Sequence, residues 1–93
     1  MIVRFTRRAE QDLADILDYL VERSPRGARN VAASLREAIR VIADHPHGGK
    51  RTGLPTVLVK IVPKYPYKIF YRFEAETIDI VHIRHALRRP WTP

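Results

Sequence analysis

The spacing of the apolar residues changes once along this chain, and that change limits the folds it can adopt. Between residues 9 and 43, apolar side chains recur three or four positions apart, which is the spacing of one face of an α-helix. Between residues 57 and 84 they are β-branched or alternate with polar residues, as in β-strands. Since no linker or internal repeat separates the two halves, we expect one domain, residues 1–93, with a shared core.

The first half is expected to form a short strand and then two antiparallel helices. Thr6 can cap the first helix, and the residues before it suit a strand. Pro25 cannot continue that helix but suits the first position of a second one, with Ser24 as its cap. The second helix should end near His45, just before Pro46. The carboxylates of the first helix are interpreted as a solvated face, comprising Asp12, Asp15, Asp18 and Glu22.

The second half is expected to supply three strands. The segment 45–55 is rich in Gly and Pro and is interpreted as a loop. Strands are predicted at 57–62, 67–73 and 77–84, with short connections between them. The order β-α-α-β-β-β predicts an α+β fold, in which the N-terminal strand and the helical hairpin pack on a three- or four-stranded antiparallel sheet. The other face of this small sheet should stay partly open.

The chain is basic, and its charge is unevenly distributed. Seventeen Lys and Arg stand against ten Asp and Glu, a net charge of +7, and residues 51–93 hold eight basic and three acidic side chains, or +5. This charge favours a polyanionic partner or an acidic protein segment. The absence of Cys excludes a disulfide scaffold and a cysteine zinc site. Without a secretory segment or a membrane-spanning run, a complete cytoplasmic protein with no membrane partner is expected.

The strand predicted at 67–73 carries cations on one side. Lys68, Phe70 and Arg72 should share the face opposite to the apolar residues between them. Two cations around an aromatic ring suit phosphate neutralisation with base stacking, or capture of an acidic peptide. An ordinary solvated edge explains the same pattern.

The segment 82–91 holds two His, three Arg and the only Trp. Arg suits bidentate contact with phosphate or carboxylate, and a His among such cations should have a lowered pKa, which leaves it able to accept a proton. The alternative is a basic tail pinned by Trp91, and for the two His alone this simpler interpretation is favoured. His45 and His47 lack a third ligand and are interpreted as part of a turn, so no metal or other cofactor is expected.

Taken together, several segments resemble the RelE/ParE superfamily of type II toxins along nearly the whole chain. Each segment is weak alone, but their order and spacing are fairly specific. The acidic helix and the Tyr-x-Ile-x-Tyr strand are more similar to the ParE branch than to the RelE branch. The segments are FTRRAEQDL (5–13), DYL (18–20), PRGA (25–28), ADHP (43–46) followed by Gly48, YKIFYR (67–72), IVHIRH (80–85) and RRP (88–90).

The resemblance implies a toxin that arrests growth and is neutralised by a cognate antitoxin encoded beside it. In that family the antitoxin binds operator DNA, so no sequence-specific DNA binding is expected of this chain alone. ParE-like members are associated with inhibition of DNA gyrase, without known catalysis of their own. RelE-like members cleave mRNA on the ribosome. A third alternative is an inactive relative that only binds its antitoxin.

Compared with the ribonuclease branch, the catalytic set is depleted. Lys68 and Arg88 fall on positions of active-site arginines, and His85 is a loose analogue of a general base. Lys60 matches a lysine of that branch only if the following turn is one residue longer, and Trp91 stands nearest to its C-terminal tyrosine. This depletion favours a gyrase inhibitor over a ribonuclease. The predicted effector or partner surface is the basic strand face and tail, comprising Lys60, Lys68, Arg72, Arg84, Arg88 and Arg89, with Trp91 as an anchor.

Overall fold

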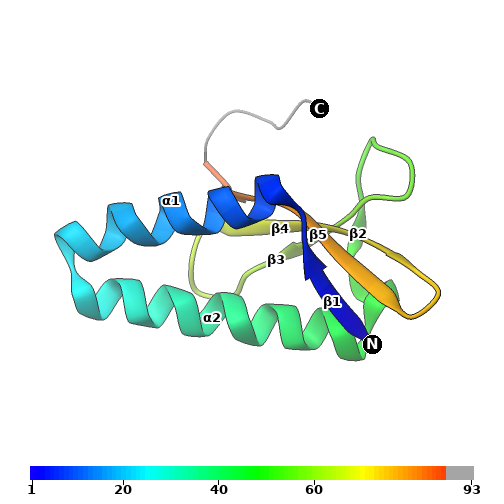
Figure 1. The fold of residues 1–93 in the computed structure, drawn as a ribbon, viewed down its shortest axis with the longest axis horizontal. Coiled ribbons are helices and arrows are strands. Elements are labelled where there is room, and N and C mark those ends of the chain that lie inside the picture. The colour runs from blue at the N-terminus through cyan, green and yellow to red at the C-terminus, as the bar shows by residue number, and fades with distance from the viewer. Residues whose placement is uncertain (88–93) are drawn as a thin grey trace.

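In the computed structural model, which describes residues 1–87, two antiparallel helices cover one face of a five-stranded sheet (Figure 1). The predicted element order is confirmed, with a two-residue strand and a 3-10 turn added in the segment expected to be a loop. The elements are β1 (Ile2–Phe5), α1 (Arg7–Arg23), α2 (Pro25–Asp44), η1 (Pro46–Gly48), β2 (Lys50–Arg51), β3 (Leu58–Ile61), β4 (Tyr67–Glu74) and β5 (Thr77–His85).

Each helix begins at the hydroxyl residue that the sequence predicted. Thr6 Oγ1 accepts a hydrogen bond from the Ala9 amide at 3.2 Å, and Ser24 Oγ accepts one from the Gly27 amide at 2.9 Å. The Ser24 amide also donates to the Leu20 carbonyl at 2.7 Å. Ser24 therefore ends α1 and begins α2, which makes the hairpin turn between the helices very short.

The strands are ordered β1-β5-β4-β3-β2, and β1 lies parallel to β5 while the other neighbouring pairs are antiparallel. The predicted sheet is confirmed as mostly antiparallel. The expected three or four strands are corrected to five, because β2 is added and β1 joins the sheet as a parallel edge strand. A parallel pair needs a long crossover, which the chain between β1 and β5 provides. Phe70 pairs with His82 and Tyr71 with Ile80, so Val81 is the extra residue of a β-bulge in β5.

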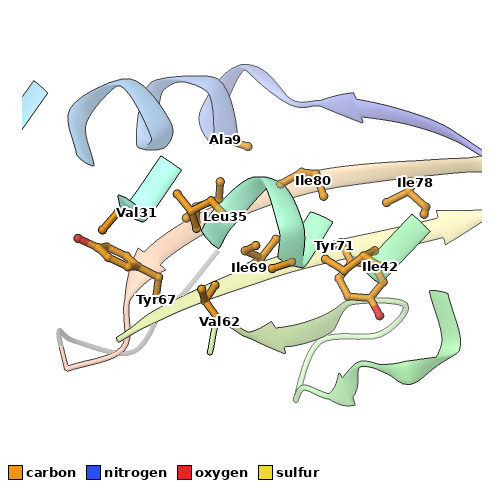
Figure 2. Close-up of a cluster of buried hydrophobic side chains, with 12 residues drawn as sticks. Ala9, Val31, Leu35, Ile42, Val62, Tyr67, Ile69, Tyr71, Ile78 and Ile80 are labelled. Atoms are coloured by element: carbon orange, nitrogen blue, oxygen red, sulfur yellow. The ribbon is translucent and has the colours of Figure 1, made fainter. Parts of the chain in front are cut away.

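The main core lies between the helices and the sheet (Figure 2). Leu35 and Ile42 of α2 pack in one cluster with Ile69 and Tyr71 of β4, and Ile80 of β5 belongs to the same cluster. All of these side chains are almost completely buried.

In residues 1–87, neither helix combines the length and the apolar character that crossing a membrane requires.

The buried hydroxyl of Tyr71 ties the segment after α2 to the sheet. It accepts a hydrogen bond from the Gly49 amide at 3.0 Å and donates one to the Pro46 carbonyl at 2.8 Å. A Cβ atom on residue 49 would overlap this hydroxyl, so the close approach requires glycine there. Burial raises the pKa of Tyr71, which keeps the hydroxyl protonated and able to donate.

Candidate functional site

The face of the sheet turned away from the helices, called the outer face here, carries Lys68, Arg72 and Arg84. Lys68 lies directly opposite Arg84 across the β4–β5 pair, and residues so paired share a face. Like charges directly opposite one another are destabilising, so Lys68 and Arg84 together form a position that an anion would stabilise. The prediction that Lys68 and Arg72 share the face opposite to the core is confirmed, because Ile69 and Tyr71 between them are buried in the core.

Lys60 lies on the other face of the sheet. It pairs with Ile69, whose side chain is buried among the helices, whereas its neighbour Ile61 pairs with Lys68. His85 likewise pairs with the core residue Tyr67 and not with an outer-face residue. The residues predicted for the site are therefore divided between two faces. Arg88, Arg89 and Trp91 lie outside the described residues.

Phe70 is not the exposed aromatic platform that the sequence suggested. Only 7% of this residue is accessible, because Val57 and Val81 pack against it, with Leu54 alongside. The covering segment is held by Thr52, whose hydroxyl accepts from the Leu54 amide at 3.1 Å and donates to the Val57 carbonyl at 2.8 Å. Stacking of a base on the Phe70 ring is therefore blocked.

The carboxylate of Asp12, which is partly buried, pairs with the buried ring of His82, and the sequence pattern did not predict this contact. Asp12 Oδ2 lies 2.6 Å from His82 Nδ1 and accepts the Ile83 backbone amide at 3.0 Å. The Asp12 side chain is 17% exposed and that of His82 is 6% exposed. The prediction that Asp12 belongs to a solvated face is wrong. A signal was present, because Asp12 lies three residues after Ala9 and four before Ile16, on the apolar side of the helix.

The position of α1 explains why a carboxylate is needed there. β1 ends at Phe5, and the chain then follows the exposed edge of β5, where Thr6 donates its amide to the Ile80 carbonyl and its hydroxyl to the Val81 carbonyl. Six residues after Thr6, the Asp12 carboxylate accepts the Ile83 amide. Thr6 and Asp12 thus supply hydrogen-bond partners to the β5 edge beyond the end of β1.

Burial lowers the pKa of His82, and the nearby cations Arg8 and Arg84 lower it further, while Asp12 opposes both effects. The expected direction of the shift is confirmed, but burial is its main cause. The neutral ring then donates its Nδ1 hydrogen to Asp12 Oδ2. Arg8 Nε lies 3.6 Å from the other carboxylate oxygen of Asp12.

A groove of about 690 Å³ runs between α1 and the C-terminal end of β5. Asp15 and Tyr19 line it from the helix, and Tyr67 and His85 line it from the sheet. His85 Nδ1 accepts a hydrogen bond from the Leu87 amide at 3.2 Å, so the neutral ring carries its proton on Nε2.

Within residues 1–87, no three His, Asp or Glu side chains gather closely enough to hold a metal ion.

A family model described as the ParE toxin of the type II toxin–antitoxin system parDE matches residues 3–90. The protein named Toxin RelE2 from Caulobacter vibrioides is 36% identical over 86 residues, which cover 92% of this chain and 96% of that protein.

Two solved structures share the fold. The chromosomal ParDE toxin–antitoxin system from P. aeruginosa contains a chain that superposes with a TM-score of 0.81 at 23% identity, covering 91% of this chain and 95% of that chain. The intact E. coli RelBE toxin–antitoxin complex contains one with a TM-score of 0.64 at 15% identity, covering 94% and 98%. Two helices packed on a mostly antiparallel sheet are common to this fold, as the sequence predicted.

Proposed function

This chain belongs to the ParE toxin family of type II toxin–antitoxin systems, and from that premise we propose that it arrests growth by inhibiting DNA gyrase. A cognate antitoxin encoded beside it would neutralise the toxin by binding it. The solved relatives are described as toxin–antitoxin systems or complexes, which supports such a partner.

The observation that carries the choice of gyrase is the separation of the predicted ribonuclease residues. Cleavage by an adjacent 2′-hydroxyl requires a base and a cation within reach of one phosphate. Lys68 lies on the outer face, whereas His85 lies on the opposite face with its Nδ1 already accepting a hydrogen bond. Their placement on opposite faces supports a binding role over joint action on one phosphate. A binding toxin needs no such arrangement, because a charged surface is sufficient.

Ribosome-dependent mRNA cleavage is the second candidate. The observation in its favour is the Lys68–Arg84 pair, because two cations on adjacent strands can stabilise the charge that develops on a phosphate during attack. The 36% identical relative is named Toxin RelE2, and this name also supports the ribonuclease candidate.

Controlled expression in a host that lacks the antitoxin tests the proposal. We expect growth to stop, plasmid supercoiling to fall and messages to remain intact. Co-expression of the reading frame that adjoins the gene should restore growth. Rapid loss of messages at unchanged supercoiling would support the ribonuclease instead, and normal growth would indicate an inactive relative.

A further inference from the structure

A second pocket, of about 480 Å³, opens on the outer face near the start of α1. Its apolar floor is formed by Leu54, Val57 and Val81, which belong to the cluster that covers Phe70. Arg8 of α1 and Arg72 of β4 contribute to its lining. The pocket thus combines an aliphatic floor with two guanidinium groups, and we call it the arginine pocket.

The charges at this pocket are only partly compensated within the chain. Arg72 is exposed and makes no ion pair with any residue from 1 to 87. Asp79, which lies opposite Arg72 in the sheet, is bound by Arg4 at 3.2 Å. The Arg8 side chain is 57% exposed, and its nearest carboxylate oxygen, on Asp12, is 3.6 Å away. Both guanidinium groups can therefore accept a further anion.

The wall of the pocket is a strained segment. Thr56 adopts a φ of 66°, which is unfavourable for a β-branched residue. Such strain persists where the surrounding structure enforces it, and it is common at ligand-binding positions. Here Thr52 supplies the restraint, because its hydroxyl bonds to both Leu54 and Val57.

The chemistry of the pocket favours a peptide over a nucleic acid. Binding of single-stranded nucleic acid usually relies on bases stacking on exposed aromatic rings, and Phe70 is covered at this face. Leu54 and Val57 instead offer a surface for an aliphatic or aromatic side chain, and a guanidinium binds a carboxylate in a bidentate way. An acidic segment with one apolar residue between carboxylates matches both features.

We propose that the arginine pocket anchors an acidic segment of the antitoxin. One apolar side chain of that segment packs on Leu54, Val57 and Val81, and flanking carboxylates bind Arg8 and Arg72. The identity of the partner rests on the proposed function, whereas the place and chemistry of the contact rest on the pocket itself.

The test uses the full chain and the purified product of the adjoining reading frame. Replacing both cations (Arg8→Glu with Arg72→Glu) should weaken the complex about 100-fold at low salt, and the loss should shrink as salt is raised. The matched control carries Arg26→Glu with Arg29→Glu, two exposed positions on α2 with the same change in charge. This control should bind at least about tenfold more tightly than the pocket variant. Thermal unfolding checks that each variant is folded.

A third variant, Leu54→Ala, probes the apolar floor. It should weaken the complex several-fold, and this loss should not depend on salt. Wild-type affinity in the Arg8/Arg72 variant would overturn the pocket assignment while leaving the toxin–antitoxin pairing intact. Absence of binding by the wild-type chain would instead overturn the proposed partner, and this proposal with it. In a further outcome, the Arg8/Arg72 variant still binds the antitoxin with wild-type affinity but no longer binds a single-stranded RNA oligonucleotide that the wild type binds. In that case the pocket is a nucleic-acid contact and the proposal is wrong.

Discussion

The carboxylate of Asp12 lies 2.6 Å from the ring of His82 and also accepts the amide of the next residue, Ile83. One side chain of α1 thereby completes the hydrogen bonding of the β5 edge beyond the end of β1. The contact lies at the end of the groove between α1 and β5, so it fixes the helix against the strand that also carries Arg84. Its loss should affect both the stability of the fold and the geometry of the outer face.

Replacing Asp12 with Ala should destabilise the protein by about 2–3 kcal/mol, because the Ile83 amide and the His82 ring would lose their acceptor in a buried position. For a domain of this size, that corresponds to a fall of roughly 10–20 °C in the unfolding temperature. The control is Asp18→Ala, an exposed carboxylate on the same helix, which should change stability by less than about 0.5 kcal/mol. Equal stabilities for the two variants would show that the Asp12 contact does not matter.

The stability of the protein should fall as the solution is acidified below the ordinary pKa of histidine. Because burial lowers the pKa of His82 below 6.5, the unfolded chain binds a proton more readily than the folded chain. The contribution of His82 is therefore fully present above about pH 6.5 and is lost as the pH falls through the lower folded-state pKa.

Urea unfolding at several pH values between about 7 and 5.5 measures this dependence. The His82→Gln variant should show a flatter profile over that range, whereas His45→Gln, at an exposed histidine, should follow the wild type. A wild-type profile that is flat, or that rises toward acid pH, would contradict the account of His82.

Removal of the Tyr71 hydroxyl should weaken the attachment of the segment that follows α2. Tyr71→Phe leaves the Gly49 amide and the Pro46 carbonyl without their shared partner, which should cost about 1–3 kcal/mol. Gly49→Ala should also destabilise the protein, because the added methyl group would overlap the hydroxyl. Gly53→Ala is the control, since a Cβ atom there meets nothing within 4 Å. Equal unfolding temperatures for the two alanine variants would argue against this close contact.

The two faces of the sheet should differ in their importance for toxicity. Lys68→Glu changes the outer face, whereas Lys60→Glu makes the same change in charge on the neighbouring strand but on the opposite face. We expect the Lys68 variant to lose growth arrest and the Lys60 variant to keep it, with both proteins folded by circular dichroism. If the Lys60 variant lost growth arrest and the Lys68 variant kept it, the effector surface would lie on the helix side of the sheet.

Local signals in the sequence predicted the helical hairpin well. Thr6, Ser24 and Pro25 act within a few residues of themselves, so their roles as caps and helix start can be inferred from neighbours alone. The alternation of β4 likewise identified Ile69 and Tyr71 as core residues. These features depend on backbone geometry over one or two turns and need no knowledge of the tertiary fold.

Contacts between distant segments were not predictable in this way. The parallel pairing of β1 with β5 joins residues about 75 positions apart in the sequence. The contact between Asp12 and His82 joins residues that are 70 positions apart. The burial of Phe70 depends on the segment 52–57, which packs against it through Leu54 and Val57. A hydrogen bond from the Thr52 hydroxyl to the Val57 carbonyl holds this segment in place. The charge of Asp12 suggested that it is solvated. Because β1 ends at Phe5, the end of β5 has no neighbouring strand on that side, and Asp12 bonds to His82 and Ile83 there.

The most direct measurement of the central claim incubates the purified protein with DNA gyrase, supercoiled plasmid and ATP, and traps cleaved DNA with detergent and protease. In parallel, the same protein is added to ribosomes translating a defined message, and cuts are mapped by toeprinting. If the protein inhibits gyrase, the amount of linear plasmid should rise with the concentration of the wild-type protein and should be much lower with the Lys68→Glu variant. The message should remain intact in the ribosome assay. Codon-phased cuts in the message, with no trapped linear plasmid, would contradict the account.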